Sequence, residues 1–257
     1  MKKFTLVFFM LLFSICGYSQ LALEDFEDTP WGANGPTGWG IYQNSVATSI
    51  KWRQSNPLNA SIEPPYEGDY CAFLNNQNAA PGSLPQDWFT TPAFNLPANP
   101  KLQFYSRLGF NGDQGSIYKI LIMPAASDPA LLSSYTEVVV WTETQLNGNT
   151  QDDYIQKIVT TGFPAELVGQ QVRIAFYMEG VSADRWLIDN VSVGTACFVS
   201  VLEATTAITH ETASLNWENP NNYTDWEIEL IPAAQAFDGT GVPYTGQPPY
   251  LATGMDP

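Results

Sequence analysis

An acidic residue inside an apolar run is the first feature of this sequence that could do chemistry. Asp189 lies in the run 186–193, which is otherwise apolar apart from Asn190 and Ser192. A carboxylate buried without a partner costs several kcal/mol, so it must be hydrogen-bonded, ion-paired or bound to a metal. The sequence leaves three kinds of partner open: backbone N–H groups, an arginine such as Arg173 or Arg185, or a metal ion.

Residues for catalysis are scarce by comparison. The chain has one histidine, His210, and no serine or cysteine in the sequence can be matched with it as nucleophile and base. A zinc site lacks ligands for the same reason, because there is also no CxxC motif. Acidic residues number 26, but no spacing marks two of them as the acid and base of a glycoside hydrolase. We therefore predict a protein that is not an enzyme.

Short β-strands must position these residues. Residues 172–178 alternate between apolar and mixed positions, which is the period of a half-buried strand. Similar runs separated by Gly, Pro and Asn predict an all-β jelly-roll β-sandwich over residues 20–196. The predicted strands are Leu21–Glu27, Val46–Arg53, Asp69–Leu74, Asp87–Phe94, Lys101–Leu108, Ser116–Met123, Glu137–Thr142, Tyr154–Thr160, Val172–Met178 and Trp186–Val193.

Five short motifs follow one another between residues 24 and 193. The opening EDFE (24–27) is followed by PTGW (36–39), then WFTTP (88–92), and finally VRIAFYMEG (172–180) with WLIDNVSV (186–193). Together they resemble the cleaved-adhesin, or choice-of-anchor J, domains of bacterial surface proteins, over about residues 22–195. Those domains are jelly-roll sandwiches related to MAM domains.

The resemblance implies a structural calcium ion where the first and last strands lie side by side. It places Glu24 or Glu27 on the first strand and Asp189 on the last, and Asp69 is expected to add a ligand. Calcium prefers six to eight oxygen ligands from carboxylates and carbonyls. No EF-hand loop is present, since 111–115 lacks the later glutamate and fits a hairpin turn.

Aromatic residues form the second candidate site. Trp31, Trp52 and Tyr66 lie beside segments rich in Gly and Pro, and strand periodicity does not assign them to the core. Flat aromatic rings stack on sugars and anchor protein interfaces. We expect these three side chains to contact the ligand, the alternative for each being a structural role.

The N-terminus has the features of a secretory signal peptide. Lys2 and Lys3 precede an apolar stretch, residues 4–15, and we predict cleavage after Ser19. Cys16 suggests lipidation instead, but Ile15 before it is larger than that signal requires. No later apolar run is long enough to span a bilayer. We therefore predict a secreted or cell-surface protein.

A second, shorter domain is predicted over residues 197–257. Its runs 212–217 and 225–230 alternate as paired sheets require and resemble the first strands of a fibronectin type III domain, an immunoglobulin-like sandwich that is incomplete here. We expect the protein to continue covalently into further domains. The resemblance also implies that Cys197 bonds beyond Pro257 and leaves Cys71 as a buried free thiol; the alternative is a Cys71–Cys197 bond.

Charge narrows the choice of partners. With 10 Lys and Arg against 26 Asp and Glu, the net charge is -16, which argues against nucleic acid and anionic membranes. We predict a non-catalytic, calcium-stabilised adhesion or binding module whose ligand is an extracellular protein or glycan. The alternatives are a carbohydrate-binding module that targets an attached glycoside hydrolase or peptidase, and a structural spacer. The resemblance also implies export by a type IX pathway.

Overall fold

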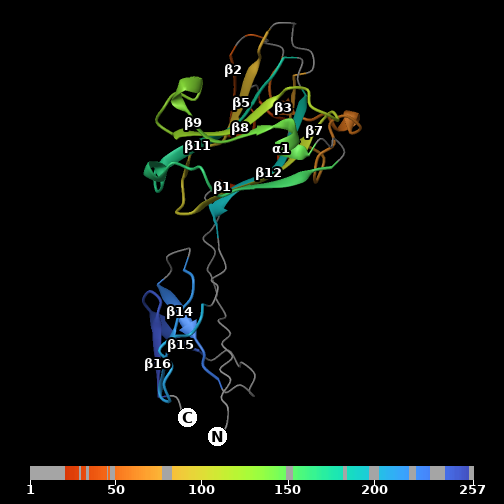
Figure 1. Ribbon diagram of the computed structural model, residues 1–257. Helices are drawn as coiled ribbons and strands as arrows, with labels where there is room; N and C mark the ends of the chain where they lie inside the picture. Colours follow the sequence, from red (N-terminus) through yellow and green to blue (C-terminus); the bar gives the residue numbers. More distant parts are fainter. Residues whose placement is uncertain are drawn as a thin grey trace. The chain divides into compact units, whose positions relative to one another are not determined.

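Strands with alternating side chains form two antiparallel sheets in the larger of two units (Figure 1). The computed structural model describes residues 21–28, 30–32, 35–44, 46, 50–76, 83–148, 153–181, 184–196, 203–219, 224–231 and 241–254. The larger unit ends at Ala196 and the smaller one follows it, and each is considered by itself. The predicted signal peptide and Cys197 lie outside the described residues.

The first sheet contains the last strand of the larger unit at its centre. Its order is β10 (Ile155–Val159), β7 (Pro100–Leu108), β12 (Arg185–Thr195), β4 (Ala72–Asn75) and β3 (Arg53–Gln54). The first strand, β1 (Leu21–Glu24), pairs antiparallel with β12, so the first and last strands are neighbours.

The second sheet has the order β2 (Gly40–Gln43), β5 (Gln86–Thr90), β11 (Gln171–Glu179), β8 (Ile117–Pro124) and β9 (Thr136–Thr142), with β6 (Phe94–Asn95) beside β11. Helical segments are short: η1 (Pro57–Asn59), η2 (Leu132–Ser134), α1 (Glu143–Asn147) and η3 (Ala165–Leu167). The all-β prediction is confirmed. No helix in the described part of the chain is long and apolar enough to cross a membrane.

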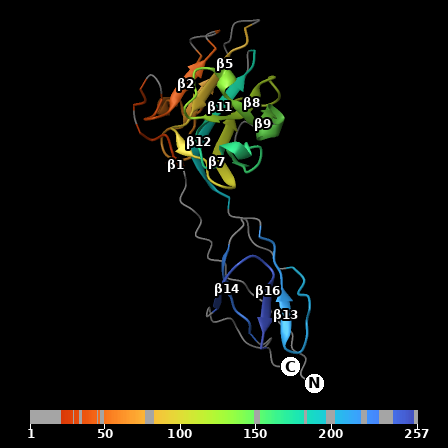
Figure 2. The ribbon, with the colours of Figure 1, turned by 90° about the vertical axis from the view of Figure 1, so that its left-hand side faces the viewer.

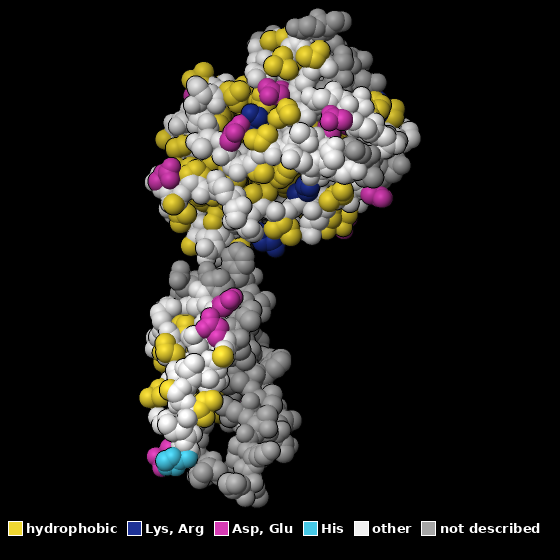
Figure 3. Space-filling view, in the orientation of Figure 1, with side chains coloured by type: hydrophobic (Ala, Val, Ile, Leu, Met, Phe, Trp, Pro, Cys, Tyr) yellow, Lys and Arg dark blue, Asp and Glu magenta, His cyan; other side chains and the backbone are white. Residues whose placement is uncertain are grey.

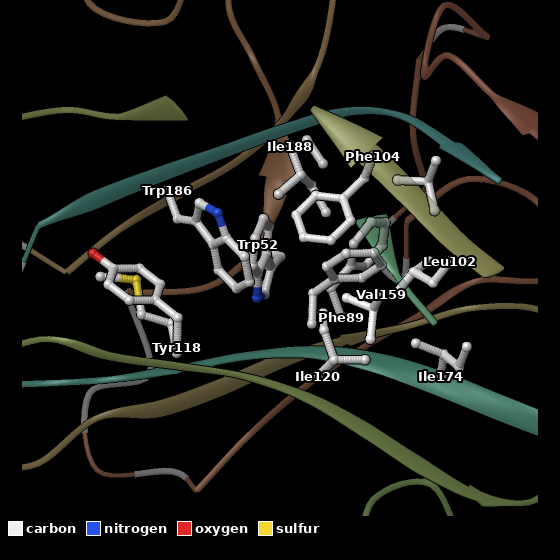
Figure 4. Packing of buried hydrophobic residues seen from close by; sticks show 14 of the residues in the cluster. Trp52, Phe89, Leu102, Phe104, Tyr118, Ile120, Val159, Ile174, Trp186 and Ile188 are labelled. Atoms are coloured by element: carbon white, nitrogen blue, oxygen red, sulfur yellow. The ribbon is translucent and has the colours of Figure 1, made fainter. Parts of the chain in front are cut away.

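Large side chains from both sheets fill the space between them (Figure 4). Along β7, residues alternate strictly between buried and half-buried, as a strand with one covered face requires. Trp186 of β12 meets Tyr118 of β8 edge-on, with ring centroids 5.1 Å apart. Such interlocking of two inner faces is the normal construction of a β-sandwich core.

Alternation along β12 places Asp189 on the face opposite Trp186 and Ile188, and a bulge follows directly after it. Pairing with β7 shifts register between Asp189 and Ser192, and Asn190 adopts a left-handed backbone with φ of 49°. The inward-facing residues are Trp186 and Ile188 before the bulge, and Val191 and Val193 after it. Asp189 therefore lies on the outer face of the first sheet, where a loop buries it.

Two expectations about local structure are wrong, and one strand was missed. Val46–Arg53 is not a strand where it is described: residues 50–52 have no strand assignment, and β3 begins at Arg53. Strand β2 was not expected, because its four residues are too few to show a period. The segment 111–115 is not a hairpin turn, since the strands on either side of it belong to different sheets.

The smaller unit contains two pairs of strands around its own core (Figure 2). Strand β13 (Thr212–Leu215) pairs with β16 (Tyr250–Thr253), and β14 (Asp225–Ile228) pairs with β15 (Val242–Thr245). The predicted inward positions are confirmed: Trp217 and Trp226 are buried and meet edge-on at 5.0 Å.

Candidate functional site

The loop of residues 64–70 covers the outer face of the first sheet and is held there by two of the predicted acids. Asp189 Oδ2 accepts hydrogen bonds from the backbone N–H groups of Tyr66 (2.9 Å) and Glu67 (3.4 Å). The Glu27 carboxylate accepts from the N–H groups of Asp69 (3.0 Å) and Tyr70 (2.9 Å). These bonds fix the path of the 64–70 loop from both of its sides.

Asp189 is fully buried beneath this loop. Its Oδ1 accepts a further bond from the backbone N–H of Asn190 at 2.8 Å, so backbone donors are the partners that the structure supplies. Burial nevertheless raises the pKa of Asp189 to about 7; the three backbone donors oppose this and the charge of Glu27 adds to it. Burial of the Asp189 carboxylate therefore favours its protonated form.

The other two predicted calcium ligands are placed differently. Glu24 accepts from the backbone N–H of Phe26 (3.1 Å) and from Nε1 of Trp39 (3.0 Å), and burial raises its pKa. Asp69 has an exposed side chain and joins the cluster through its backbone N–H. Within the described residues, no three His, Cys, Asp or Glu side chains are grouped as metal ligands.

Tyr66 is the predicted aromatic residue that lies at the surface. It is 42% exposed, and its ring stacks on Tyr105 of β7 with centroids 3.6 Å apart and planes 12° apart. Tyr154 meets it edge-on at 5.6 Å, and the Tyr154 hydroxyl donates to the carbonyl of Pro64 at 2.7 Å. The ring is thus held rigidly on a loop whose backbone is also fixed.

The prediction that Trp52 contacts a ligand is wrong, because this side chain is 0% exposed. Its ring lies between those of Phe89 (5.5 Å) and Trp186 (5.4 Å) in the middle of the core (Figure 4). Trp52 is the residue before β3, where the chain enters the first sheet and the side chain faces the second sheet. A bulky indole in that position fills the core.

Trp31 is half-buried and packs on Phe26 and Phe89, each at 5.5 Å between ring centroids. It also lines a cavity of about 260 Å³ together with nearby loop residues: Asp28, Pro30, Gly32, Gly35, Pro36 and Thr37. Trp31 is therefore mainly a core residue with one edge open to a small depression.

The sequence reading missed the strand residues that surround Tyr66. The outward positions of β7 and β10 form a strip beside it, which we call the outer strip. Its members are Gln103, Tyr105, Arg107, Gln156 and Ile158, all half-buried or exposed. The alternation of β7 assigns Leu102 and Phe104 to the core and could have identified their outward neighbours.

The cysteine that the structure describes follows the expectation. Cys71 is a buried free thiol, as predicted, and burial raises its pKa to about 12. Figure 3 shows few Lys and Arg side chains on the visible face of the larger unit, where hydrophobic and uncharged residues predominate.

No protein-family model matches the chain, and no curated protein matches it. Among solved structures, the K1 cleaved adhesin domain of Lys-gingipain from Porphyromonas gingivalis W83 is similar over 68% of this chain and 98% of its own, with 19% identity and a TM-score of 0.47. The K2 domain of Lys-gingipain covers 68% and 97%, with 15% identity and a TM-score of 0.48. TmCBM61, solved with β-1,4-galactotriose, covers 67% and 99%, with 12% identity and a TM-score of 0.40. Identities and TM-scores this low transfer no ligand or site to this chain.

Proposed function

We propose that this chain is a non-catalytic binding module of a secreted or cell-surface protein, and that its ligand contacts Tyr66 and the outer strip. The observation that carries the proposal is the state of Tyr66: it is 42% exposed yet stacked on Tyr105 at 3.6 Å. An exposed aromatic ring that is already ordered loses little entropy when it binds, which favours affinity.

The chemistry of the outer strip suits an extracellular protein or a glycan. Gln103, Arg107 and Gln156 present amide and guanidinium groups beside the ring. Hydrogen-bonding side chains around an aromatic platform can bind the hydroxyls of a sugar or the backbone of a protein. Adhesion is our main proposal, and targeting of an attached glycoside hydrolase or peptidase to a glycan is the alternative.

Support for a non-catalytic role comes from the described candidates for catalysis. His210 is exposed and its nearest charged partner is Glu211, with Nε2 and Oε1 3.2 Å apart. Cys71 is buried with a pKa raised to about 12, so it is not a thiolate at neutral pH. Neither residue has the partner that a nucleophile and base would need.

The binding proposal is tested by screening the purified protein against polysaccharides and extracellular-matrix proteins, with Tyr66→Ala and Leu58→Ala as matched variants. Leu58 is 91% exposed on η1 and has no part in the outer strip. We expect Tyr66→Ala to weaken binding by about tenfold or more, as removal of an interface anchor does, and Leu58→Ala to leave it unchanged.

The class of ligand retained on the array decides between adhesion and glycan targeting. Binding that survives Tyr66→Ala would contradict the proposed surface. An absence of any ligand would favour the spacer hypothesis.

A structural calcium ion beside Glu27 and Asp189 is a second part of the proposal. Both carboxylates hold the same loop, and the buried Asp189 has a raised pKa that a bound cation would lower. Backbone carbonyls would have to complete the six to eight ligands. Export, the signal peptide and the fibronectin type III character of the smaller unit also belong to this proposal, and they rest on the resemblance of the sequence.

The calcium prediction is tested by thermal melting. We expect a chelator to lower the melting temperature of the larger unit, and Asp189→Asn to abolish the difference between chelator and excess calcium. Identical melting of the wild-type protein under both conditions would refute the calcium site.

A further inference from the structure

A separate group of buried polar residues lies between the two sheets, at the end of the sandwich where β4 finishes and β12 begins. We call it the polar end cluster: Asn76, Ser116, Tyr118, Glu143 and Asp184, each at most 1% exposed. It is distinct from the acids under the 64–70 loop, which lie on the outer face of the first sheet.

Asn76 and Asp184 face each other across paired strands. Arg185 and Asn75 are the last paired residues of the two strands. Just beyond them, the backbone N–H of Asn76 donates to the carbonyl of Asp184 at 3.1 Å. By strand alternation these two side chains continue the inward rows that contain Leu74 and Trp186. They therefore point between the sheets.

The second sheet and α1 supply the remaining members. Ser116 Oγ accepts from the backbone N–H of Asp184 at 3.1 Å, and the Ser116 N–H donates to Glu143 at 2.9 Å. Tyr118 packs edge-on against Trp186, and Figure 4 shows its hydroxyl pointing away from Trp52 and Phe89. The charge of Glu143 is close enough to Asp184 to add to the rise that burial gives its pKa.

Four polar atoms of this cluster have no hydrogen-bond partner among the described residues: Oδ2 of Asp184, Oδ1 and Nδ2 of Asn76, and the hydroxyl of Tyr118. A buried polar group left unpaired costs about 1–3 kcal/mol, and more when it is charged. Neither Asp184 nor Glu143 takes part in an ion pair with a described cationic side chain. Three of the unpaired atoms are oxygens, and they occur beside two buried carboxylates.

We propose that the polar end cluster binds a divalent cation of the calcium class, with Asp184 as its main ligand and Asn76 Oδ1 and Glu143 as further ligands. Two carboxylates would balance the charge of the ion, and amide, hydroxyl and backbone oxygens are the neutral ligands that calcium accepts. Asp184 Oδ1 already accepts from the N–H of Gly109 (3.0 Å), so Oδ2 is the oxygen available to the metal. The ion would join the first sheet to the second.

The experiment is a calorimetric calcium titration of the chelator-treated protein, with bound calcium counted by atomic emission after dialysis. The variants are Asp184→Asn, Asp189→Asn and, as control, Asp128→Asn, an exposed carboxylate in the loop before η2. Asparagine can keep the bonds that Asp184 Oδ1 accepts, so the variant should fold, and circular dichroism checks this.

We expect Asp184→Asn to bind one calcium ion fewer than the wild type, while Asp128→Asn binds the same number. Asp189→Asn should retain the Asp184 ion, which separates this site from the calcium proposed beside Glu27. A crystal of the wild type grown with calcium should show an ion between Asp184 and Asn76. Equal calcium content in the wild type and Asp184→Asn, or ordered water alone at that position, would overturn the proposal.

Discussion

Gly68 is the residue on which the geometry of the 64–70 loop depends. Its φ is +69°, in the left-handed region, and a Cβ added there would collide with the carboxylate of Glu27. That carboxylate cannot simply move aside, because it accepts the N–H groups of Asp69 and Tyr70. A side chain at position 68 would therefore disturb both the backbone and the acid that holds it.

We expect Gly68→Ala to lower the free energy of unfolding by about 1–2 kcal/mol for the left-handed backbone, and by about 1.5–3 kcal/mol more for a weakened hydrogen bond to a charged group. Gly169→Ala is the matched control, since Gly169 has φ of +77° and nothing within 4 Å of the added atom. Chemical denaturation of both variants measures the difference. Equal destabilisation would mean that the contact with Glu27 contributes nothing.

Single residues differed in how well the sequence predicted them. Asp189 stood out because a charge within an apolar run demands a partner, but the loop that buries it on the outer face of the first sheet could not be identified from the sequence. Trp52 could not be separated from Tyr66 by neighbouring Gly and Pro. Trp52 precedes β3 and faces the second sheet, whereas Tyr66 lies on the loop over the outer face, and tertiary packing decides between these positions.

At the scale of strands, periodicity predicted the long strands and missed a short one. Strands of seven residues or more, such as β7, β8 and β11, repeat their pattern often enough to show a period of two. Strand β2 has four residues and shows none. The short helix α1 begins with a capping box between Thr142 and Gln145, a signal that is readable in the sequence.

The sequence alone did not predict which strands pair, and this pairing determines which residues lie together in each site. The neighbourhood of β1 and β12 was expected only through the resemblance to a known domain, and the pairing is present. The juxtaposition of Asn76 with Asp184 had no such guide, because the residues are far apart in sequence and neither lies in a motif. Contacts of this kind follow from sheet order and register, which local pattern does not determine.

For the larger unit as a whole, stability depends on pH in an unusual way, because three buried acids form no ion pair with a described cationic side chain. Burial raises the pKa values of Asp87, Asp184 and Asp189 to about 7 each. Between the usual carboxyl pKa near 4 and this value, the folded state binds more protons than the unfolded state. Stability is therefore greatest on the acidic side of this window and is lost as the pH rises through 7.

We expect the melting temperature of the calcium-free larger unit to fall between pH 5 and pH 7.5, with each acid contributing at most about 1.4 kcal/mol per pH unit. Calcium bound at Asp184 and Asp189 should remove their contributions to the pH dependence of the melting temperature. The contribution of Asp87 should remain, because its oxygens have no partner among the described residues. Asp87→Asn, neutral at every pH, should remove that remaining share. Differential scanning calorimetry across the window measures all three, and a melting temperature that rises with pH would show that these acids are ionised and compensated in the folded state.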